Sequence, residues 1–167
     1  MIKTIKIHFS RNREGKILSK GIMLYEGVNY SHCAIEFYLN SIEKEVIYHS
    51  SLVGVNFSSK ELFVKHNEIV ETYELEVSIE IYRKIMSSLI DNCGKEYAVM
   101  QNFGIVLVEV LAKLGKNIDN PWRDGYNCSE LVYEHIIKNV YEEDFNINKN
   151  MIKPSQVKQI LDNKKEE

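Results

Sequence analysis

The sequence predicts an α+β fold, with a strand-rich first half and a helical second half. Two observations support this class. Segments of the first half alternate apolar and polar residues, as strands with one buried face do. Segments of the second half repeat apolar residues every three or four positions, as amphipathic helices do. With 167 residues and neither an internal repeat nor a linker, the chain is expected to form one domain over residues 1–167.

Strands are expected where β-prone composition and alternation coincide. The runs 30–39 and 45–50 are separated by the turn-like residues 40–44, which predicts an antiparallel pair. Residues 52–57 are expected to extend the second of these strands after a bend near Gly54. The expected strands are residues 2–10, 30–39, 45–50 and 70–77.

Helices are expected before this strand pair and throughout the second half. Residues 16–26 repeat apolar side chains at helical spacing. The stripe Ile81, Ile85 and Leu89 indicates a helix that begins after residue 78 and ends at Gly94. The remaining expected elements are helices over residues 97–114, from 128 to about 140 and after 155, with a loop at 117–125.

Composition excludes several classes of function. A net charge of −3 and a sequence pI near 6.0 give no electrostatic reason to expect nucleic acid as the main partner. No apolar signal-peptide core follows Met1, and the longest uncharged run, residues 97–108, is too short to span a bilayer. Three cysteines spaced neither as a zinc site nor as a disulfide framework predict a reduced protein without a metal. We expect a cytoplasmic protein, and a phage product would look the same.

The sequence Asn127-Cys128-Ser129-Glu130 is the most informative stretch for chemistry. Asn127 is a good N-cap, and Glu130 stands three residues later, where it can bond back to the cap. Cys128 is then expected in the first turn of a helix, where the helix dipole and free N–H groups favour a thiolate. Its own backbone N–H is a candidate oxyanion donor. The alternative is a buried and unreactive cysteine, as free cysteines commonly are.

A thiol nucleophile needs a base and a group that orients the base. His32 lies between apolar neighbours in the predicted strand 30–39 and is the candidate base. His49, on the predicted neighbouring strand, is placed to bond the second ring nitrogen of His32 and fix its tautomer. Glu36 shares a strand face with His32 and is held as a reserve orienter. Each of these side chains also has a purely structural interpretation, as a satisfied histidine or a cross-strand polar pair.

Five short motifs lie in order along the chain. They are Ser19-Lys20-Gly21-Ile22 with Tyr30-Ser31-His32-Cys33-Ala34-Ile35, Val46-Ile47-Tyr48-His49-Ser50 with Gly54-Val55, Gly94-Lys95-Glu96-Tyr97, Tyr126-Asn127-Cys128-Ser129-Glu130-Leu131-Val132, and Pro154-Ser155-Gln156. Together these motifs resemble the circularly permuted branch of the NlpC/P60 papain-like superfamily, which includes YiiX/YaeF-type amidase-like proteins and lecithin:retinol acyltransferase-like proteins. The resemblance covers about Ser19 to Ile160.

The resemblance implies a permuted papain-like fold, with an antiparallel sheet presenting His32 and His49 to the helix that carries Cys128. It implies a cysteine-dependent amide or ester hydrolase that forms an acyl-enzyme and needs no cofactor, acting on a peptide, amide or lipid-derived substrate. YiiX-type members often have Glu where this chain has His49, so the third role departs from their pattern. The alternatives are a lipid acyltransferase, or an inactive member that binds a peptide or lipid or serves as a phage structural protein. The oligomeric state does not follow from these residues.

Overall fold

A computed structural model describes most of the chain. The described residues are 1–51, 54–95, 105, 108, 111–112, 115–116, 118, 127–143, 145 and 147–166. The predicted helix 97–114 and the predicted loop 117–125 lie for the most part outside these residues.

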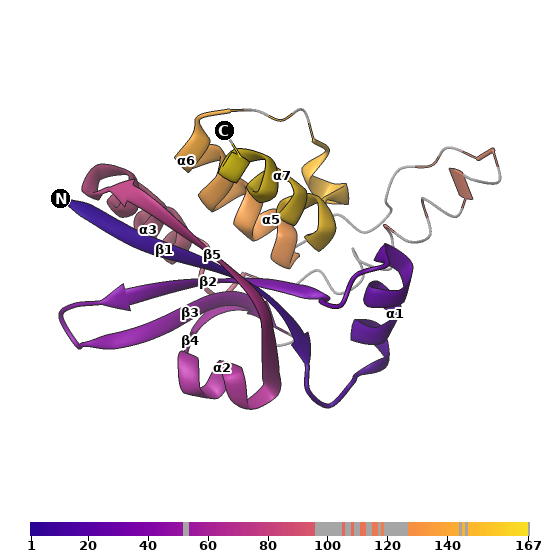
Figure 1. Cartoon of the computed structure of the whole chain (residues 1–167), viewed down its shortest axis with the longest axis horizontal. Helices are drawn as coiled ribbons and strands as arrows, with labels where there is room; N and C mark the ends of the chain where they lie inside the picture. Colours follow the sequence, from indigo (N-terminus) through magenta and orange to yellow (C-terminus); the bar gives the residue numbers. More distant parts are fainter. Residues whose placement is uncertain are drawn as a thin grey trace.

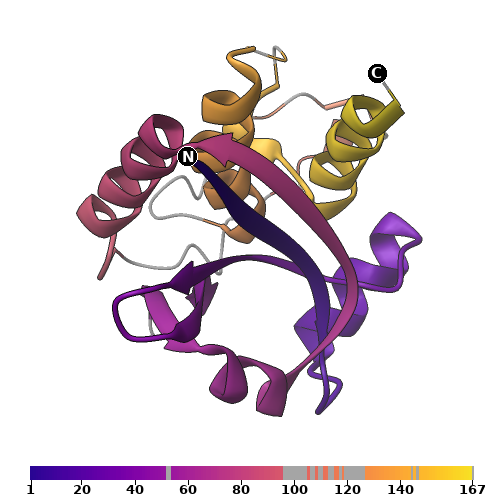
Figure 2. The same ribbon diagram turned by 60° about the vertical axis from the view of Figure 1, so that its left-hand side comes forward.

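Five antiparallel strands form one sheet in the order β4-β3-β2-β1-β5. The strands curve around the helical half of the molecule (Figure 2). Pairing between β2 and β3 runs from Leu39 opposite Lys44 to Ile35 opposite Tyr48. Beyond Ile35, the start of β2 and the end of β3 continue without pairing to each other. The strands are β1 (Ile2–Asn12), β2 (His32–Leu39), β3 (Lys44–Ser51), β4 (Gly54–Ser59) and β5 (Asn67–Ser78).

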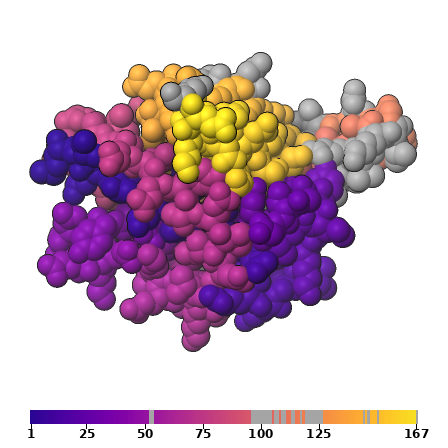
Figure 3. All heavy atoms as spheres, viewed as in Figure 1, coloured from indigo at the N-terminus to yellow at the C-terminus, as the bar shows by residue number. Residues whose placement is uncertain are grey.

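The helices form two layers, with α5, α6 and α7 over one face of the sheet and α2 against the other (Figure 1). The C-terminal helix α7 lies at the surface over β5 and beside α1 (Figure 3). Within the described residues, no helix is both long enough and apolar enough to cross a bilayer. The helical elements are α1 (Ile17–Glu26), α2 (Lys60–His66), α3 (Ile79–Asp91), α5 (Cys128–Val132), the π-helical turn η1 (Tyr133–Ile137), α6 (Lys138–Tyr141), the 3₁₀ turn η2 (Lys149–Met151) and α7 (Pro154–Glu166).

The predicted strands and most predicted helices are confirmed, with two corrections in the region after β3. Residues 54–57 do not extend β3, because they belong to β4, which begins at Gly54 and pairs antiparallel with β3. Residues 52 and 53 lie outside the described part of the chain. The sequence pattern does not predict helix α2. Its N-cap is Ser59, whose hydroxyl accepts a hydrogen bond from the backbone N–H of Leu62 at 3.2 Å. The predicted helix from 128 to about 140 is confirmed, but η1 interrupts its α-helical geometry.

The main core lies between the sheet and the α5-η1-α7 layer. Alternation along β2 points Cys33, Ile35 and Phe37 into this core, each at most 1% exposed. Leu131 and Val132 of α5 pack against them from the helical side. Burying one such aliphatic side chain contributes roughly 1.5–3 kcal/mol, so this face holds α5 firmly on the sheet.

The motif Gly54-Val55 and the motif that begins at Gly94 meet where β4 begins. The backbone N–H of Gly94 donates to the Val55 carbonyl at 2.8 Å, and the N–H of Val55 donates to the Lys95 carbonyl at 3.0 Å. Gly54 has φ +114°, and a Cβ at this position would stand 3.0 Å from the Lys95 carbonyl oxygen. The close approach and the backbone angle both require glycine here. The residues that complete the second motif, 96 and 97, lie outside the described part of the chain.

Candidate active site

Cys128 is the first residue of α5, as its sequence context predicts. Asn127 has the extended backbone of an N-cap, and its side-chain Oδ1 accepts a hydrogen bond from the backbone N–H of Glu130 at 2.8 Å. The capping bond fixes the first turn, in which backbone N–H groups have no partner within the helix. Cys128 is therefore held where the helix favours a negative charge and offers an N–H donor.

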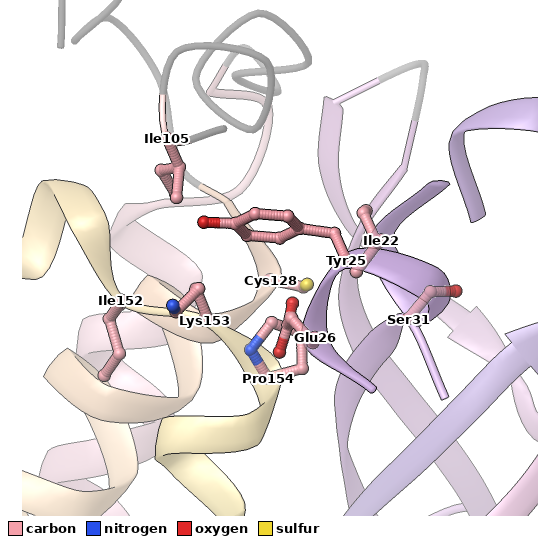
Figure 4. Close-up of a pocket in the computed structure, with 9 residues that line it drawn as sticks. All are labelled: Ile22, Tyr25, Glu26, Ser31, Ile105, Cys128, Ile152, Lys153 and Pro154. Carbon is pink, nitrogen blue, oxygen red and sulfur yellow. The ribbon is translucent and has the colours of Figure 1, made fainter. Parts of the chain in front are cut away.

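The Cys128 sulfur points into a pocket between α1 and the N-terminal end of α7 (Figure 4). The pocket encloses about 330 Å³ of space, part of it open to solvent. Cys128 itself is only 3% exposed, so the pocket is its approach from outside. Most of the lining side chains are apolar or aromatic, with one carboxylate and one lysine among them. They are Ile22, Tyr25, Glu26, Ser31, Ile105, Cys128, Ile152, Lys153 and Pro154.

The Cys128 thiol is strongly acidified. A hydrogen bond with the thiol of Cys33 is the largest cause that lowers its pKa. Electrostatic attraction and a hydrogen bond from His32 lower the pKa further, as does a hydrogen bond from the backbone of Cys33. Burial opposes these effects, but the pKa of Cys128 stays well below that of an ordinary thiol. Because the thiolate is the reactive form of cysteine, this lower pKa increases the fraction of Cys128 that is in the reactive form.

His32 and His49 are brought together at the open end of the β2-β3 pair. Their rings lie edge to face, with centroids 5.6 Å apart and an angle of 79° between the planes. Phe63 of α2 supports both rings, at 6.2 Å from His32 and 5.1 Å from His49. His32 thus packs against His49 and Phe63 and also interacts with Cys128.

His49 is an uncharged neighbour of His32. Burial and, next, the charge of His32 lower the pKa of His49 to about 3, although a backbone hydrogen bond at Ser50 opposes the shift. Its Nε2 lies 3.4 Å from the Ser58 hydroxyl. No hydrogen bond joins the two imidazoles among the described residues, so the contact between them is aromatic packing.

Glu36 is engaged elsewhere. Its Oε2 accepts from His8 Nε2 at 2.8 Å and from Lys60 Nζ at 3.0 Å, and Lys6 Nζ lies 3.9 Å from Oε1. Burial would raise the pKa of Glu36, but the bonds from His8 and Lys60 outweigh it and hold the pKa below its usual value. In the described chain no hydrogen bond or ion pair connects Glu36 with His32. The reserve orienter thus serves a separate charged cluster on the α2 face of the sheet.

A carboxylate that sequence reasoning missed, Glu26, lies in the pocket beside Cys128 (Figure 4). Its Oε2 accepts from the backbone N–H of Ser155 at 2.9 Å, in the first turn of α7. Burial raises the pKa of Glu26 most, the negative charge of Cys128 raises it further, and the Ser155 and Lys153 contacts oppose these effects. Glu26 is the last residue of α1, where the helix dipole disfavours an acid, and that mismatch was the available signal.

Cys33 is the second residue that sequence reasoning left out of the site. It was expected to face away from His32 into the core, and it is buried there at 1% exposure. The core position is also next to Cys128, because α5 packs on β2. Strand alternation predicts which face a side chain is on, but it contains no information about which helix covers that face.

The comparisons with known proteins give no assignment. No family model matches the chain, and no curated protein sequence matches it significantly. Within the described residues, no group of three or more His, Cys, Asp or Glu side chains is arranged to hold a metal ion.

Proposed function

We propose that the protein is a cysteine-dependent amide or ester hydrolase of the permuted papain-like class. Cys128 is its nucleophile, His32 its general base and acid, and His49 a neutral positioning residue. One observation carries the proposal: an acidified thiol at a capped helix N-terminus opens into a pocket and contacts a histidine. A purely structural cysteine in an apolar core is instead expected to have a raised pKa.

The proposed reaction is acyl transfer through a covalent intermediate. The Cys128 thiolate attacks the carbonyl carbon of the substrate, and the backbone N–H of Cys128 donates to the oxygen that becomes negative. His32 gives a proton to the departing amine or alcohol, which leaves an acyl group on the sulfur. His32 then takes a proton from water as the water attacks, and the acid product and free thiolate result. No step uses a cofactor.

The neutral state of His49 bears on how His32 acts. A carboxylate in the orienting position stabilises an imidazolium by charge as well as by geometry, whereas a neutral histidine offers geometry alone. The thiolate of Cys128 supplies the negative charge that His32 needs before the substrate binds. In this proposal His49 and Phe63 fix the ring of His32 by packing, beside the thiolate of Cys128.

The pocket supports a substrate with an apolar part near the reacting carbonyl. Its walls come from three parts of the chain, with Ile22 from α1, Ile105, and Ile152 and Pro154 from the segment that leads into α7 and from its first residue. The Tyr25 ring lies across the pocket above the Cys128 sulfur (Figure 4). Such walls exclude water around the sulfur, which strengthens the electrostatic interactions of the thiolate.

The pH dependence of Cys128 alkylation by iodoacetamide tests the pairing of thiol and base. We expect rapid labelling at pH 6 in the native chain and slow labelling in His32→Ala. Peptide mass spectrometry separates the three cysteines, and the exposed Cys93, whose pKa is raised by burial, is the internal reference. The proposal is contradicted if labelling of Cys128 rises only near about pH 8.5, the ordinary pKa range of a thiol, and is the same in the variant.

A second measurement tests the acyl-enzyme directly. The native chain is incubated with a p-nitrophenyl ester and quenched in acid, and the peptides are then mapped. We expect an acyl group on Cys128 and a burst of p-nitrophenol, both absent from Cys128→Ser and retained in Cys93→Ser. A thiolate that labels rapidly but never acylates points instead to a member of this class that binds without catalysis.

A further inference from the structure

The candidate site contains two cysteines, from elements far apart in sequence. Cys33 of β2 and Cys128 of α5 are 1% and 3% exposed and belong to the same buried cluster. The hydroxyl oxygen of Ser129 lies 3.8 Å from the Cys33 sulfur and 4.0 Å from the Cys128 sulfur. Both sulfurs thus lie close to the same oxygen atom of Ser129, and neither sulfur is part of a disulfide.

The two sulfurs differ in protonation. Burial, followed by the neighbouring Cys128, raises the pKa of Cys33 well above that of an ordinary thiol, whereas the pKa of Cys128 is lowered. The site therefore favours the charged form of Cys128 and the neutral form of Cys33. A thiolate is the form that a peroxide oxidises, and a neighbouring thiol converts the resulting sulfenic acid to a disulfide before further oxidation.

The two sulfurs also differ in how a small molecule from solvent can reach them. Cys128 lines the pocket, so a small oxidant can reach it, while Cys33 is absent from the pocket wall and lies behind it in the core. The third cysteine, Cys93, is an exposed residue, but its thiol is partly shielded from water, and this burial raises its pKa. Of the three thiols, Cys128 combines a path for the oxidant with a stabilised negative charge.

We propose that Cys33 is a resolving cysteine, which forms a reversible disulfide with Cys128 when a peroxide oxidises the site. In the first step, the Cys128 thiolate attacks an oxygen of hydrogen peroxide, the O–O bond breaks, and Cys128 sulfenic acid and hydroxide form. In the second step, the Cys33 sulfur attacks the Cys128 sulfur and the S–OH oxygen leaves with the Cys33 proton as water. The disulfide blocks the nucleophile, and a dithiol restores it. The inference requires a reactive Cys128 thiolate but not hydrolysis.

Peptide mapping of the peroxide-treated native chain tests the disulfide. Free thiols are blocked with N-ethylmaleimide in denaturant, and the chain is cleaved with trypsin without reduction. Trypsin places the three cysteines in separate peptides, residues 21–44, 85–95 and 124–138. We expect a linked pair of 21–44 and 124–138 that disappears after dithiothreitol, with 85–95 alkylated. A linked pair that contains 85–95 instead, or no linked pair while 124–138 carries sulfinic acid, overturns the inference.

Variants separate resolution from simple burial. In Cys33→Ala and Cys33→Ser, Cys128 should trap dimedone as a sulfenic acid and then pass to sulfinic acid, with roughly tenfold less thiol recovered by dithiothreitol than in the native chain. Cys93→Ser should behave as the native chain does. Circular dichroism confirms that each variant is folded, and the native mapping stands by itself if neither Cys33 variant folds. Equal recovery in folded Cys33→Ala and native chain contradicts the inference.

Discussion

Glu26 accepts a hydrogen bond from the backbone N–H of Ser155 at 2.9 Å, and this bond ties the end of α1 to the start of α7 on the wall of the pocket. The same carboxylate stands beside Cys128, and its pKa is raised by burial and, to a lesser extent, by the negative charge of Cys128. One side chain thus joins two helices and adds a repulsive charge to the site. The two effects can be separated by substitution.

Glu26→Gln removes the charge but keeps an oxygen that can accept from Ser155. We expect its stability to stay near that of the native chain and the pH at which Cys128 is alkylated to move lower, because repulsion of the thiolate is lost. Glu26→Ala also loses the acceptor, so it should unfold about 1 kcal/mol more easily in urea. A Glu26→Gln profile displaced to higher pH contradicts the repulsive role.

Asn127→Ala tests the cap that positions Cys128. Loss of the side-chain acceptor for Glu130 should cost about 1 kcal/mol in the free energy of unfolding. Alkylation of Cys128 at pH 6 should also slow, since the first turn of α5 is no longer held. Asn127→Ser keeps a capping oxygen and is the matched control. If the alanine variant labels Cys128 as fast as the serine variant does, the cap does not contribute to thiolate stability.

Local chemistry explains which parts of the fold and the site were predictable. The capped helix at Cys128 depends on Asn127 and its immediate neighbours, and the strand around His32 depends on a short apolar run, so both could be read from sequence. The sequence predicts only a bend near Gly54, because glycine permits many backbone angles and does not itself specify +114°. Helix α2 spans only seven residues, too few for a clear apolar period.

The missed site residues depend on tertiary packing. Glu26 reaches Ser155 across more than a hundred residues of chain, and Cys33 meets Cys128 only because α5 lies on β2. For Glu36, tertiary packing provides a partner other than the expected one. It shares the expected strand face with His32, but β1 brings His8 within 2.8 Å of its carboxylate, and that pairing across strands determines its role.

Gly54→Ala and Gly21→Ala form a matched pair that tests the backbone at the start of β4. A Cβ at Gly54 stands 3.0 Å from the Lys95 carbonyl oxygen and the backbone has φ +114°, so we expect a loss of about 1–3 kcal/mol in unfolding free energy. A Cβ at Gly21 in α1 meets nothing within 4 Å, so alanine there should stabilise the helix by about 0.5–1 kcal/mol. Urea denaturation measures both, and equal effects of the same sign contradict the assigned strain.

The low pKa of His49 predicts how stability changes with pH. Because its pKa falls from 6.5 to about 3 on folding, the unfolded chain binds a proton at this side chain that the folded chain does not. The stability from this group is fully present above pH 6.5 and is lost as the pH falls toward 3. His49→Asn removes the titration, so between pH 7 and pH 4.5 it should lose less stability than the native chain, by on the order of 2 kcal/mol. His66→Asn, which changes an exposed histidine, is the control for removing a histidine elsewhere. Parallel urea-denaturation profiles for the native chain and His49→Asn across this range would show that His49 is not held neutral by the fold.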